Sequence, residues 1–465
     1  MLLPVTSEKT SGDTIRIGGC DVSRLKDRFK TPLYILDIQT IKKQCSDYID
    51  SFRFSDFETE IIYASKAFCT IPMCQLVRQS GLSIDVSTGG ELFIALRSGY
   101  EPEKIYFHGN NKSPEEIKFA LDYHVGTFIV DNFDELETLN NLAREREIIQ
   151  KIMLRVTPGI KAHTHKYIQT GAVESKFGFG LHAGIAHEAV KKAAAMANIE
   201  LAGIHSHIGS QIFNIEVYDK LIEVLTGFLG EVKESDGILI EEINIGGGLG
   251  IKYTDQDEPA GIDELSKLVY DALQKYTKQN KINIRKIYLE PGRSIVGNAG
   301  VTLYEVGTVK CIPQVKNYIS IDGGMSDNIR PILYQAKYEA WIANRAYYFD
   351  EIENGEIINR SSKETGNDFI KYTIVGKHCE SGDVIIEDIM MPEVKKGDLI
   401  LVGTTGAYCY SMSSNYNGQP RSAVVAVDDG NCWLWVERQT YGDLVSKDKK
   451  LFEMKICDSE SLFNI

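Results

Sequence analysis

Eight short apolar segments recur between residues 61 and 293, and this recurrence restricts the possible folds more than any other feature of the sequence. Each of the first seven is followed by a segment with apolar residues at positions i, i+3 and i+4, the spacing of an amphipathic helix. Nearly continuous apolar strands that alternate with helices are typical of parallel strands covered by helices. The pattern predicts the α/β class, with eight strands closed into a (β/α)8 barrel. The eight segments are residues 61–66, 81–87, 104–110, 127–132, 151–158, 201–209, 243–250 and 286–293.

The pattern changes after residue 300, where short runs of β-forming residues are separated by Gly, Asp and Lys turns. These runs predict a second, mostly antiparallel β domain. Two strand-like runs precede the barrel pattern, and we expect them to join that domain. The predicted division is 1–37 for these N-terminal strands, 38–300 for the barrel and 301–465 for the β domain. The polar segment 339–370, rich in Asn, Glu and Ser, is expected to be an exposed excursion.

The overall charge argues against two classes of partner. The net charge is −14 and the pI is about 5.3, whereas nucleic acids and anionic membranes require a basic face. No stretch reaches the roughly 18 apolar residues of a membrane-spanning helix. We therefore expect a small-molecule substrate, with neither a nucleic-acid nor a membrane partner.

Cysteine usage and the N-terminal residues bear on the compartment. The nine cysteines include no C-x-x-C pair, which favours free thiols in a reducing environment. The first residues, "MLLPVTSEKT", contain no basic segment and no long apolar run, so we expect no signal peptide. These features predict a cytoplasmic protein.

Charged, imidazole and glycine groups stand where the predicted strands end. In barrels of this type, chemistry collects at the C-terminal ends of the strands. A lone lysine there is usually solvated, and a lone glycine triplet is often only a tight turn. The joint pattern favours a functional rim, because a barrel built only for stability needs no charges there. The rim residues are Lys66, Asp85, His108, Arg155, His205, His207, Ser210, Gly246, Gly247, Gly248, Glu290, Gly292 and Arg293.

Glycines after the seventh and eighth strands predict an anion site. "GGGLG", which begins at Gly246, frees backbone N–H groups for an anion. Gly292 and Arg293 follow the eighth strand, where such barrels commonly bind phosphate. A phosphate site beside the amine of Lys66 predicts pyridoxal 5'-phosphate, held by Lys66 as a Schiff base.

Other rim groups suit the ring of that cofactor. Glu290 is our candidate for the carboxylate that faces the pyridine nitrogen, and His205 or His207 could stack on the ring. We also expect desolvation and neighbouring cations to lower the pKa of Lys66 and so expose its amine lone pair.

Two other interpretations of these residues are open at this point. His205 with His207, or His163 with His165, could ligate zinc, but no third ligand with a clear spacing appears, so we predict no metal. The segment "GGGLG" also resembles a dinucleotide-binding loop weakly. It lacks the G-x-G-x-x-G spacing and an early βαβ position.

Several motifs together resemble one family, the diaminopimelate decarboxylases. These pyridoxal-phosphate enzymes convert meso-2,6-diaminopimelate to L-lysine and carbon dioxide in the last step of lysine biosynthesis. The resemblance covers roughly residues 30–430, with the motifs in the same order. The motifs are "YASKA", "SKFGFG", "HIGSQI", "GGGLG", "EPGR", "DGGMSDNIRPILY", "CESGD" and "GAYCYSMSSNYN".

The resemblance implies a role for each cofactor residue. Lys66 would carry the cofactor, His207 would stack on its face, and Glu290 would pair with the pyridine nitrogen. Ser210 and the glycine backbone would hold the phosphate. Together with the rim candidate Asp85, the expected cofactor-binding set is Lys66, Asp85, His207, Ser210, Gly246, Gly247, Gly248, Glu290, Gly292, Arg293 and Tyr408.

The resemblance also implies a substrate site shared between two subunits of a homodimer. Cys379 and Glu380 would reach in from the other subunit, Cys379 as proton donor and Glu380 to hold the distal ammonium group. The carboxyl group would leave the D-configured carbon, with Lys66 as the alternative proton donor. The expected substrate-binding residues are Arg293, Arg330, Tyr334, Glu380 and Tyr408, and the catalytic residues are Lys66 and Cys379.

Other functions compete with the one that the resemblance implies, and two further structural features are expected. A decarboxylase of ornithine, arginine or carboxynorspermidine is the first alternative, but such a substrate has no use for Arg330, and those relatives carry aspartate in place of Glu380. An amino-acid racemase would need a tyrosine opposite the lysine, and a non-catalytic carrier would usually lack the β domain. We also expect a mobile loop over the site, from "HTHKYIQTGAVE" to "SKFGFG", and an insertion near residues 340–370.

Overall fold

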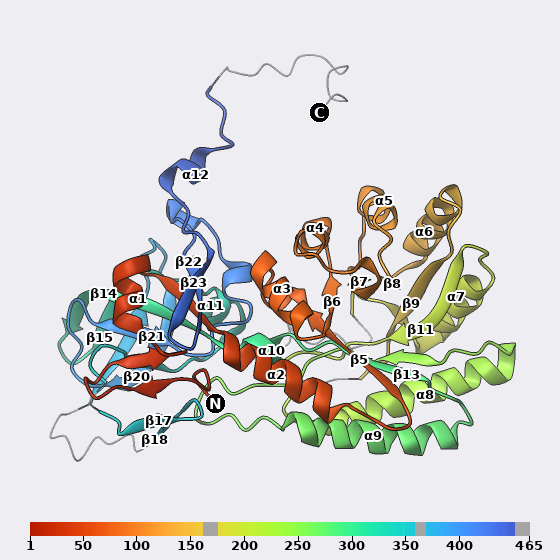
Figure 1. The fold of residues 1–465 in the computed structure, drawn as a ribbon, viewed down its shortest axis with the longest axis horizontal. Helices are drawn as coiled ribbons and strands as arrows, with labels where there is room; N and C mark the ends of the chain where they lie inside the picture. Colours follow the sequence, from red (N-terminus) through yellow and green to blue (C-terminus); the bar gives the residue numbers. More distant parts are fainter. Residues whose placement is uncertain (161–174, 347, 359–368, 452–465) are drawn as a thin grey trace.

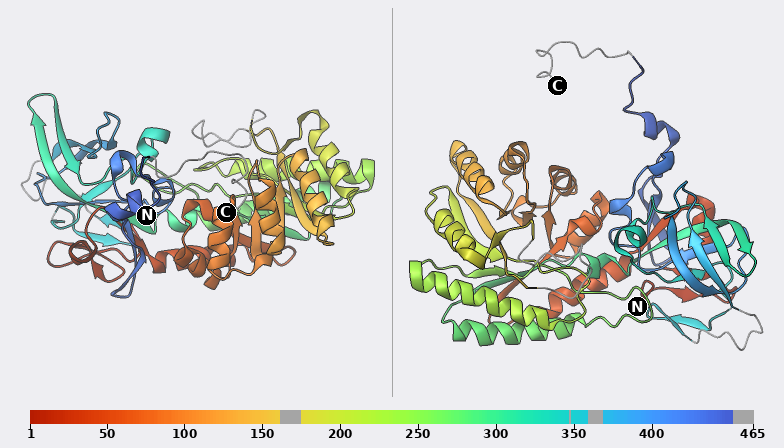
Figure 2. Two further views of the ribbon diagram at one scale, coloured as in Figure 1. Left: turned by 90° about the horizontal axis from the view of Figure 1, so that it is seen from above. Right: turned by 180° about the vertical axis from the view of Figure 1, so that it is seen from behind.

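A computed structural model of the chain describes residues 1–160, 175–346, 348–358 and 369–451. Two bodies lie side by side along its long axis, a ring of strands and helices and a separate sheet domain (Figures 1 and 2). In the described part of the chain, no helix combines the length and the apolar character needed to cross a membrane.

Eight parallel strands form a closed barrel, which confirms the predicted fold class. Each strand pairs in parallel with the next along the chain, and β13 pairs back onto β5 and closes the ring. A two-residue strand, β10 (Phe179–Gly180), extends the sheet beside β9. The barrel strands are β5 (Glu58–Ala64), β6 (Ser83–Val86), β7 (Ile105–Phe107), β8 (Thr127–Val130), β9 (Gln150–Thr157), β11 (Ile199–His205), β12 (Glu242–Asn244) and β13 (Lys286–Leu289).

Helices follow the barrel strands and surround them (Figure 1). Side-chain caps fix where several of these helices begin. Thr70, Thr88 and Asn132 each accept a hydrogen bond from a backbone N–H in the first turn, and Ser113 forms a capping box with Glu116. Each cap contributes about 1 kcal/mol and directs the chain from the rim into the helix. The barrel helices are α2 (Ile38–Ser51), α3 (Ile71–Gln79), α4 (Gly89–Arg97), α5 (Pro114–Asp122), α6 (Phe133–Glu145), α7 (Ile185–Ala194), α8 (Glu216–Asp236), α9 (Ile262–Gln279) and α10 (Arg293–Val296).

The end of the barrel opposite the rim is a network of paired charges. Glu242, which is buried, lies 2.9 Å from Lys151 and also pairs with Arg285. Glu60 lies 2.5 Å from Lys286. Acids and bases therefore compensate one another at this end of the barrel.

The second body is a nine-stranded, mostly antiparallel sheet, as predicted. Its central strand is β14, which pairs with β4, β15 and β21. We did not predict β14, although it is the longest strand of the described residues. The strands of this sheet are β4 (Leu33–Asp37), β14 (Gly300–Ile312), β15 (Lys316–Ile321), β16 (Ala340–Ile342), β19 (Ile370–Val375), β20 (Val384–Met391), β21 (Leu399–Val402), β22 (Ala423–Asp428) and β23 (Asn431–Val436).

Smaller elements border this sheet. Helix α12 stands away from the body of the molecule (Figures 1 and 2). The remaining elements are β1 (Glu8–Lys9), β2 (Ile15–Ile17) and β3 (Cys20–Asp21), which form one small sheet, the hairpin of β17 (Glu351–Glu353) and β18 (Glu356–Ile358), and the helices α1 (Val22–Phe29), α11 (Arg330–Tyr334) and α12 (Tyr441–Val445).

The expected exposed excursion over 339–370 is wrong for its first part. Trp341 lies in β16 and is 1% exposed, and Tyr348 and Phe349 are also buried in the core of the sheet domain. Apolar side chains scattered among polar ones anchor this segment. Residues 359–368 lie outside the described part, as do 161–174, where most of the expected mobile loop falls.

Candidate active site

Lys66 lies on a single turn of 3-10 helix, η1 (Ser65–Ala67), directly after β5. Its side chain is solvent-accessible at the rim. Burial of the surrounding site lowers the pKa of Lys66, but the charges of Asp85, Tyr408 and Glu290 raise it by more. The net shift is upward, so our expectation of a lowered pKa was wrong. The two carboxylates outweigh the neighbouring cation, Arg155.

Asp85 lies in β6, beside the turn that carries Lys66. Its Oδ1 accepts a hydrogen bond of 2.9 Å from the backbone N–H of Ser65, while its Oδ2 is buried without a hydrogen-bond partner among the described residues. Burial raises the pKa of Asp85 to about 7, against the opposing effect of Lys66. One oxygen of the carboxyl group therefore fixes the backbone of the lysine turn. The other oxygen, Oδ2, remains able to form a hydrogen bond with a ligand at the rim.

Three side chains surround the carboxylate of Glu290, which follows β13. Asn244 Nδ2 donates to its Oε1 at 2.7 Å, and His108 Nε2 lies 2.8 Å from the same oxygen. His205 Nε2 lies 3.1 Å from Oε2. Burial raises the pKa of Glu290, but the two histidines lower it by more, so it lies well below the usual value. Glu290 is a fixed anion on the floor of the site.

The two histidines of "HSHIG" have separate surroundings. His205 is the last residue of β11, and its Nε2 forms a hydrogen bond with Glu290. His207 lies just beyond the strand and is half-buried. Burial, followed by Lys66 and Arg155, lowers the pKa of His207 well below its usual value. His207 is therefore a neutral, flat imidazole at the rim.

The histidine pairs considered for zinc are not brought together as a site in the described residues. His163 and His165 lie outside that part of the chain. A different group, His108, His205 and Glu290, has ligand atoms that all lie within 4.8 Å of one another. The imidazoles of His108 and His205 both lie beside the carboxylate of Glu290, while His108 Nε2 and His205 Nδ1 have no hydrogen-bond partner among the described residues.

The glycine triplet after β12 is required by close packing and leaves two donors free. A Cβ atom at Gly247 would lie 2.0 Å from the backbone oxygen of Glu290, and Gly246 has a φ of 69°. The Gly246 N–H donates to Asn244 Oδ1 at 2.8 Å. The N–H groups of Gly247 and Gly248 meet no acceptor within the described parts of the chain. The turn can therefore donate to an anion.

Two buried arginines lie at the rim with tyrosines for partners. Arg293 begins α10 and donates to Ser210 Oγ at 2.9 Å and to Tyr253 Oη at 2.5 Å. Arg330 begins α11, donates to Tyr338 Oη and places its guanidinium carbon 4.6 Å from the ring centre of Tyr253. In the described residues neither arginine forms an ion pair, and Arg330 Nε is buried without a hydrogen-bond partner. These two cations therefore differ from the charged groups at the opposite end of the barrel, which are paired with one another.

Tyr408 and Tyr334 complete the near side of the rim. The Tyr408 N–H donates to the backbone oxygen of Ala67 at 2.8 Å, and the guanidinium of Arg293 lies 4.8 Å from its ring centre. Tyr408 therefore lies between the lysine turn and an arginine. Tyr334 is half-buried at the end of α11.

Cys379 and Glu380 do not join this cluster within one chain. Both are exposed on the loop before β20. The Cys379 N–H donates to Asn417 Oδ1 at 2.9 Å, and Glu380 Oε1 accepts from the N–H of Gly382. In the described part of a single chain, the structure brings neither residue into contact with Lys66.

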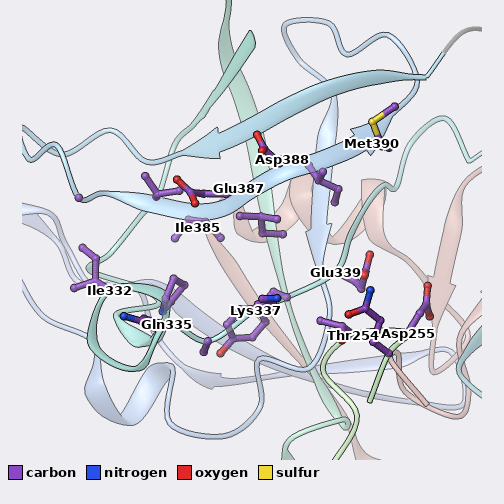
Figure 3. Close-up of a pocket in the computed structure, with 18 residues that line it drawn as sticks. Thr254, Asp255, Ile332, Gln335, Lys337, Glu339, Ile385, Glu387, Asp388 and Met390 are labelled. Atoms are coloured by element: carbon purple, nitrogen blue, oxygen red, sulfur yellow. The ribbon is translucent and has the colours of Figure 1, made fainter. Parts of the chain in front are cut away.

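A cavity of about 840 Å³ lies between the sheet domain and residues 254–256 of the barrel, separate from the lysine turn. It opens between β20, which carries Ile385, Glu387 and Asp388, and the segment that follows α11 (Figure 3). Tyr338 lines one wall, so the cavity adjoins the arginine cluster but does not contain it.

Four residues of the site were not assigned a role from the sequence. His108 was noted at a strand end, and Asn244 stands two residues before the glycine triplet, so position alone could have identified both. Tyr253 and Tyr338 have no comparable signal. Tyr338 contacts Arg330 from eight residues further along the chain, whereas Tyr253 reaches Arg330 only because the barrel and the sheet domain are packed together.

Comparisons with known proteins bear on the family and the fold of the chain. Residues 38–297 match the family model described as "Pyridoxal-dependent decarboxylase, pyridoxal binding domain". The chain is 43% identical to the diaminopimelate decarboxylase of Bacillus subtilis over 96% of this chain and 98% of that protein. It is 42% identical to the diaminopimelate decarboxylase of Halalkalibacterium halodurans, again over 96% and 98%. The diaminopimelate decarboxylase of M. jannaschii, solved in complex with L-lysine, superposes with a TM-score of 0.86 at 34% identity over 97% of this chain and 99% of that chain.

Proposed function

Because the chain belongs to the family of diaminopimelate decarboxylases, we propose that its rim residues divide into a cofactor site and a substrate site. The reaction is the decarboxylation of meso-2,6-diaminopimelate to L-lysine and carbon dioxide, the last step of lysine biosynthesis. One feature of the structure supports this substrate above others. Two buried arginines without carboxylate partners in the described residues stand beside the lysine turn, and a dicarboxylate supplies what they lack.

The residues present fit pyridoxal 5'-phosphate. The free N–H groups of Gly247 and Gly248 and the hydroxyl of Ser210 suit a phosphate. Gly292 belongs to the same set, because a Cβ atom there would lie 2.8 Å from Ala64 Cβ, so the backbone can approach closely. Arg293 adds a positive charge at this end of the site.

The other end of the site suits the ring. Lys66 would hold the cofactor covalently, Glu290 would face its ring nitrogen as a fixed anion, and His207 would lie against its face. Asp85 would contact the cofactor beside Lys66 through its Oδ2, which has no hydrogen-bond partner among the described residues. When bound, pyridoxal 5'-phosphate provides an electron sink for the electron pair that remains when carbon dioxide leaves.

The protein itself orients the substrate and moves a proton. Arg293 and Arg330 bind a carboxylate of the substrate, assisted by Tyr334 and Tyr408. The Sγ of Cys379, or the Nζ of Lys66, donates the proton that replaces the lost carboxyl group on carbon. Glu380 holds the distal ammonium group. A diamino monocarboxylate such as ornithine lacks the distal carboxylate, so the arginines favour diaminopimelate over the basic amino acids.

We further propose a cytoplasmic homodimer with shared active sites. The exposure of Cys379 and Glu380 on a single chain supports this arrangement, because a proton donor must lie within reach of the reacting carbon. The chain divides, in this proposal, into N-terminal strands (1–37), a cofactor-binding barrel (38–300) and a β domain (301–465).

Complementation between two inactive variants tests the shared site. With Cys379 as the proton donor, Lys66→Ala and Cys379→Ala should each be nearly inactive alone, because each lacks one half of every site. Co-expressed, they should form mixed dimers with one intact site, and random assembly should restore about a quarter of the wild-type activity. The measurement is lysine release by the purified mixture. Absence of any recovery, with mixed dimers verified by two affinity tags, would contradict the shared site.

A further inference from the structure

One tyrosine, Tyr253, contacts both buried arginines of the site. Its hydroxyl accepts a hydrogen bond of 2.5 Å from Arg293, and its ring centre lies 4.6 Å from the guanidinium carbon of Arg330. The guanidinium carbon of Arg293 lies 5.7 Å from the same ring centre. We propose that Tyr253 is a positioning residue for the substrate, which holds Arg293 and Arg330 together as one fork for a single carboxylate. This inference rests on the proposed function.

Tyr253 stands where the two bodies of the molecule meet. It follows the glycine turn of the barrel, yet its side chain is packed in the core of the sheet domain and is only 6% exposed. It meets Tyr338 edge to face, with ring centres 5.4 Å apart and an interplanar angle of 88°. Because Arg293 belongs to the barrel and Arg330 to the sheet domain, Tyr253 couples the position of one arginine to that of the other.

The chemistry of tyrosine suits this task. Two guanidinium groups repel each other, and in the described residues no acid offsets them. The face of an aromatic ring carries negative charge density and attracts a cation, while the hydroxyl oxygen accepts a hydrogen bond. Tyr253 can therefore keep both cations buried near each other without neutralising them. An entering carboxylate then finds two preformed groups of donors.

Tyr338 is the less direct choice for a test. It accepts a hydrogen bond from Arg330 but forms none with Arg293 in the described part of the chain, and it also forms a wall of the cavity of about 840 Å³. A change there would alter a cavity as well as an arginine. Tyr253→Phe is cleaner, since it keeps the ring over Arg330 and removes only the acceptor for Arg293.

The experiment compares two ligands that differ in one carboxylate. L-lysine keeps a carboxylate, whereas cadaverine has the same carbon chain and both amines but no carboxylate. Their affinities for the cofactor-loaded enzyme are measured by calorimetry and as inhibition constants. The variants are Tyr253→Phe and Tyr253→Leu, with Tyr100→Phe as the control. Tyr100 is also buried, lies in the barrel, and donates its hydroxyl to the backbone oxygen of Leu82 at 2.9 Å.

We expect a loss that is confined to L-lysine. Its affinity should fall about tenfold in Tyr253→Phe, which removes a charged hydrogen bond, and about a hundredfold in Tyr253→Leu, which also removes the ring. The affinity for cadaverine should stay unchanged, as should both affinities in Tyr100→Phe. The KM for meso-diaminopimelate should rise in the same order while kcat changes less.

Two results would overturn the inference. Unchanged affinity for L-lysine in Tyr253→Phe would show that the hydroxyl does not position the fork. Equal losses for L-lysine and cadaverine would mark Tyr253 as a residue of general structural importance. If the wild-type protein released no carbon dioxide from meso-diaminopimelate, the proposed function would fail, and the calorimetric ratio of the two ligands would still decide the role of Tyr253.

Discussion

Lys66→Ala should reduce the decarboxylation of meso-diaminopimelate by a thousandfold or more. Lys66 stands on the turn after β5, between Asp85 and Tyr408, and we assign it both the cofactor linkage and one route for proton return. Loss of a positioned acid or base alone typically costs about 10²- to 10⁴-fold, and the covalent attachment is lost in addition. Lysine release in steady-state assays measures the loss.

Lys66→Arg is the matched variant. It keeps the positive charge near Asp85, but a guanidinium stays protonated and does not attack a carbonyl carbon. We expect Lys66→Arg to be as inactive as Lys66→Ala, and both to lose pyridoxal 5'-phosphate during gel filtration. Activity above about a tenth of wild type in either variant, beyond the loss expected for a catalytic group, would show that Lys66 is not essential.

Arg330→Gln should lower kcat/KM for meso-diaminopimelate by about 10²- to 10³-fold, mainly through KM. Arg330 is 5% exposed, and its buried Nε has no hydrogen-bond partner in the described chain. Removal of one side of a buried, hydrogen-bonded charge pair costs about 2 to 5 kcal/mol, and here that pair forms only with substrate. The stability of the fold should fall less than the activity, since no acid among the described residues loses an ion-pair partner.

Arg330→Lys separates charge from geometry. Lysine keeps the charge but cannot present the parallel N–H groups of a guanidinium. Its kcat/KM should lie between those of wild type and Arg330→Gln. An unchanged KM in Arg330→Gln would remove the residue from the substrate site. Melting curves of all three proteins exclude a general loss of fold.

Much of the barrel could be predicted because burial leaves a local trace. The segment 81–87, for example, contains β6 (Ser83–Val86), whose four residues are all buried. Strand β14 left no such trace. Its first residues are buried, but its second half is exposed and carries Gly307 and Lys310, so no apolar run appears. The segment around Trp341 was misjudged for the converse reason, since its many polar residues mask a few buried aromatic ones.

The site divides in the same way. Lys66 and Glu290 could be predicted from the sequence because the ends of the strands can be recognised there. The structure places both residues at one rim. The pairing of Arg293 and Arg330 through Tyr253 is not visible, because it depends on how two bodies pack. The direction of the Lys66 pKa shift failed for a similar reason. The sequence places charged groups at the rim, but only the fold shows that Asp85 and Glu290 outweigh Arg155.

The most direct test of the central claim is to supply the purified protein, loaded with pyridoxal 5'-phosphate, with meso-diaminopimelate, ornithine and arginine in parallel. Release of carbon dioxide and the product amine is then measured. We predict turnover of meso-diaminopimelate to L-lysine, with no comparable reaction of the other two, because only the first offers a distal carboxylate to Arg293 and Arg330. Preferred turnover of ornithine or arginine would contradict the assignment of the two arginines and Glu380 to the distal end of the substrate.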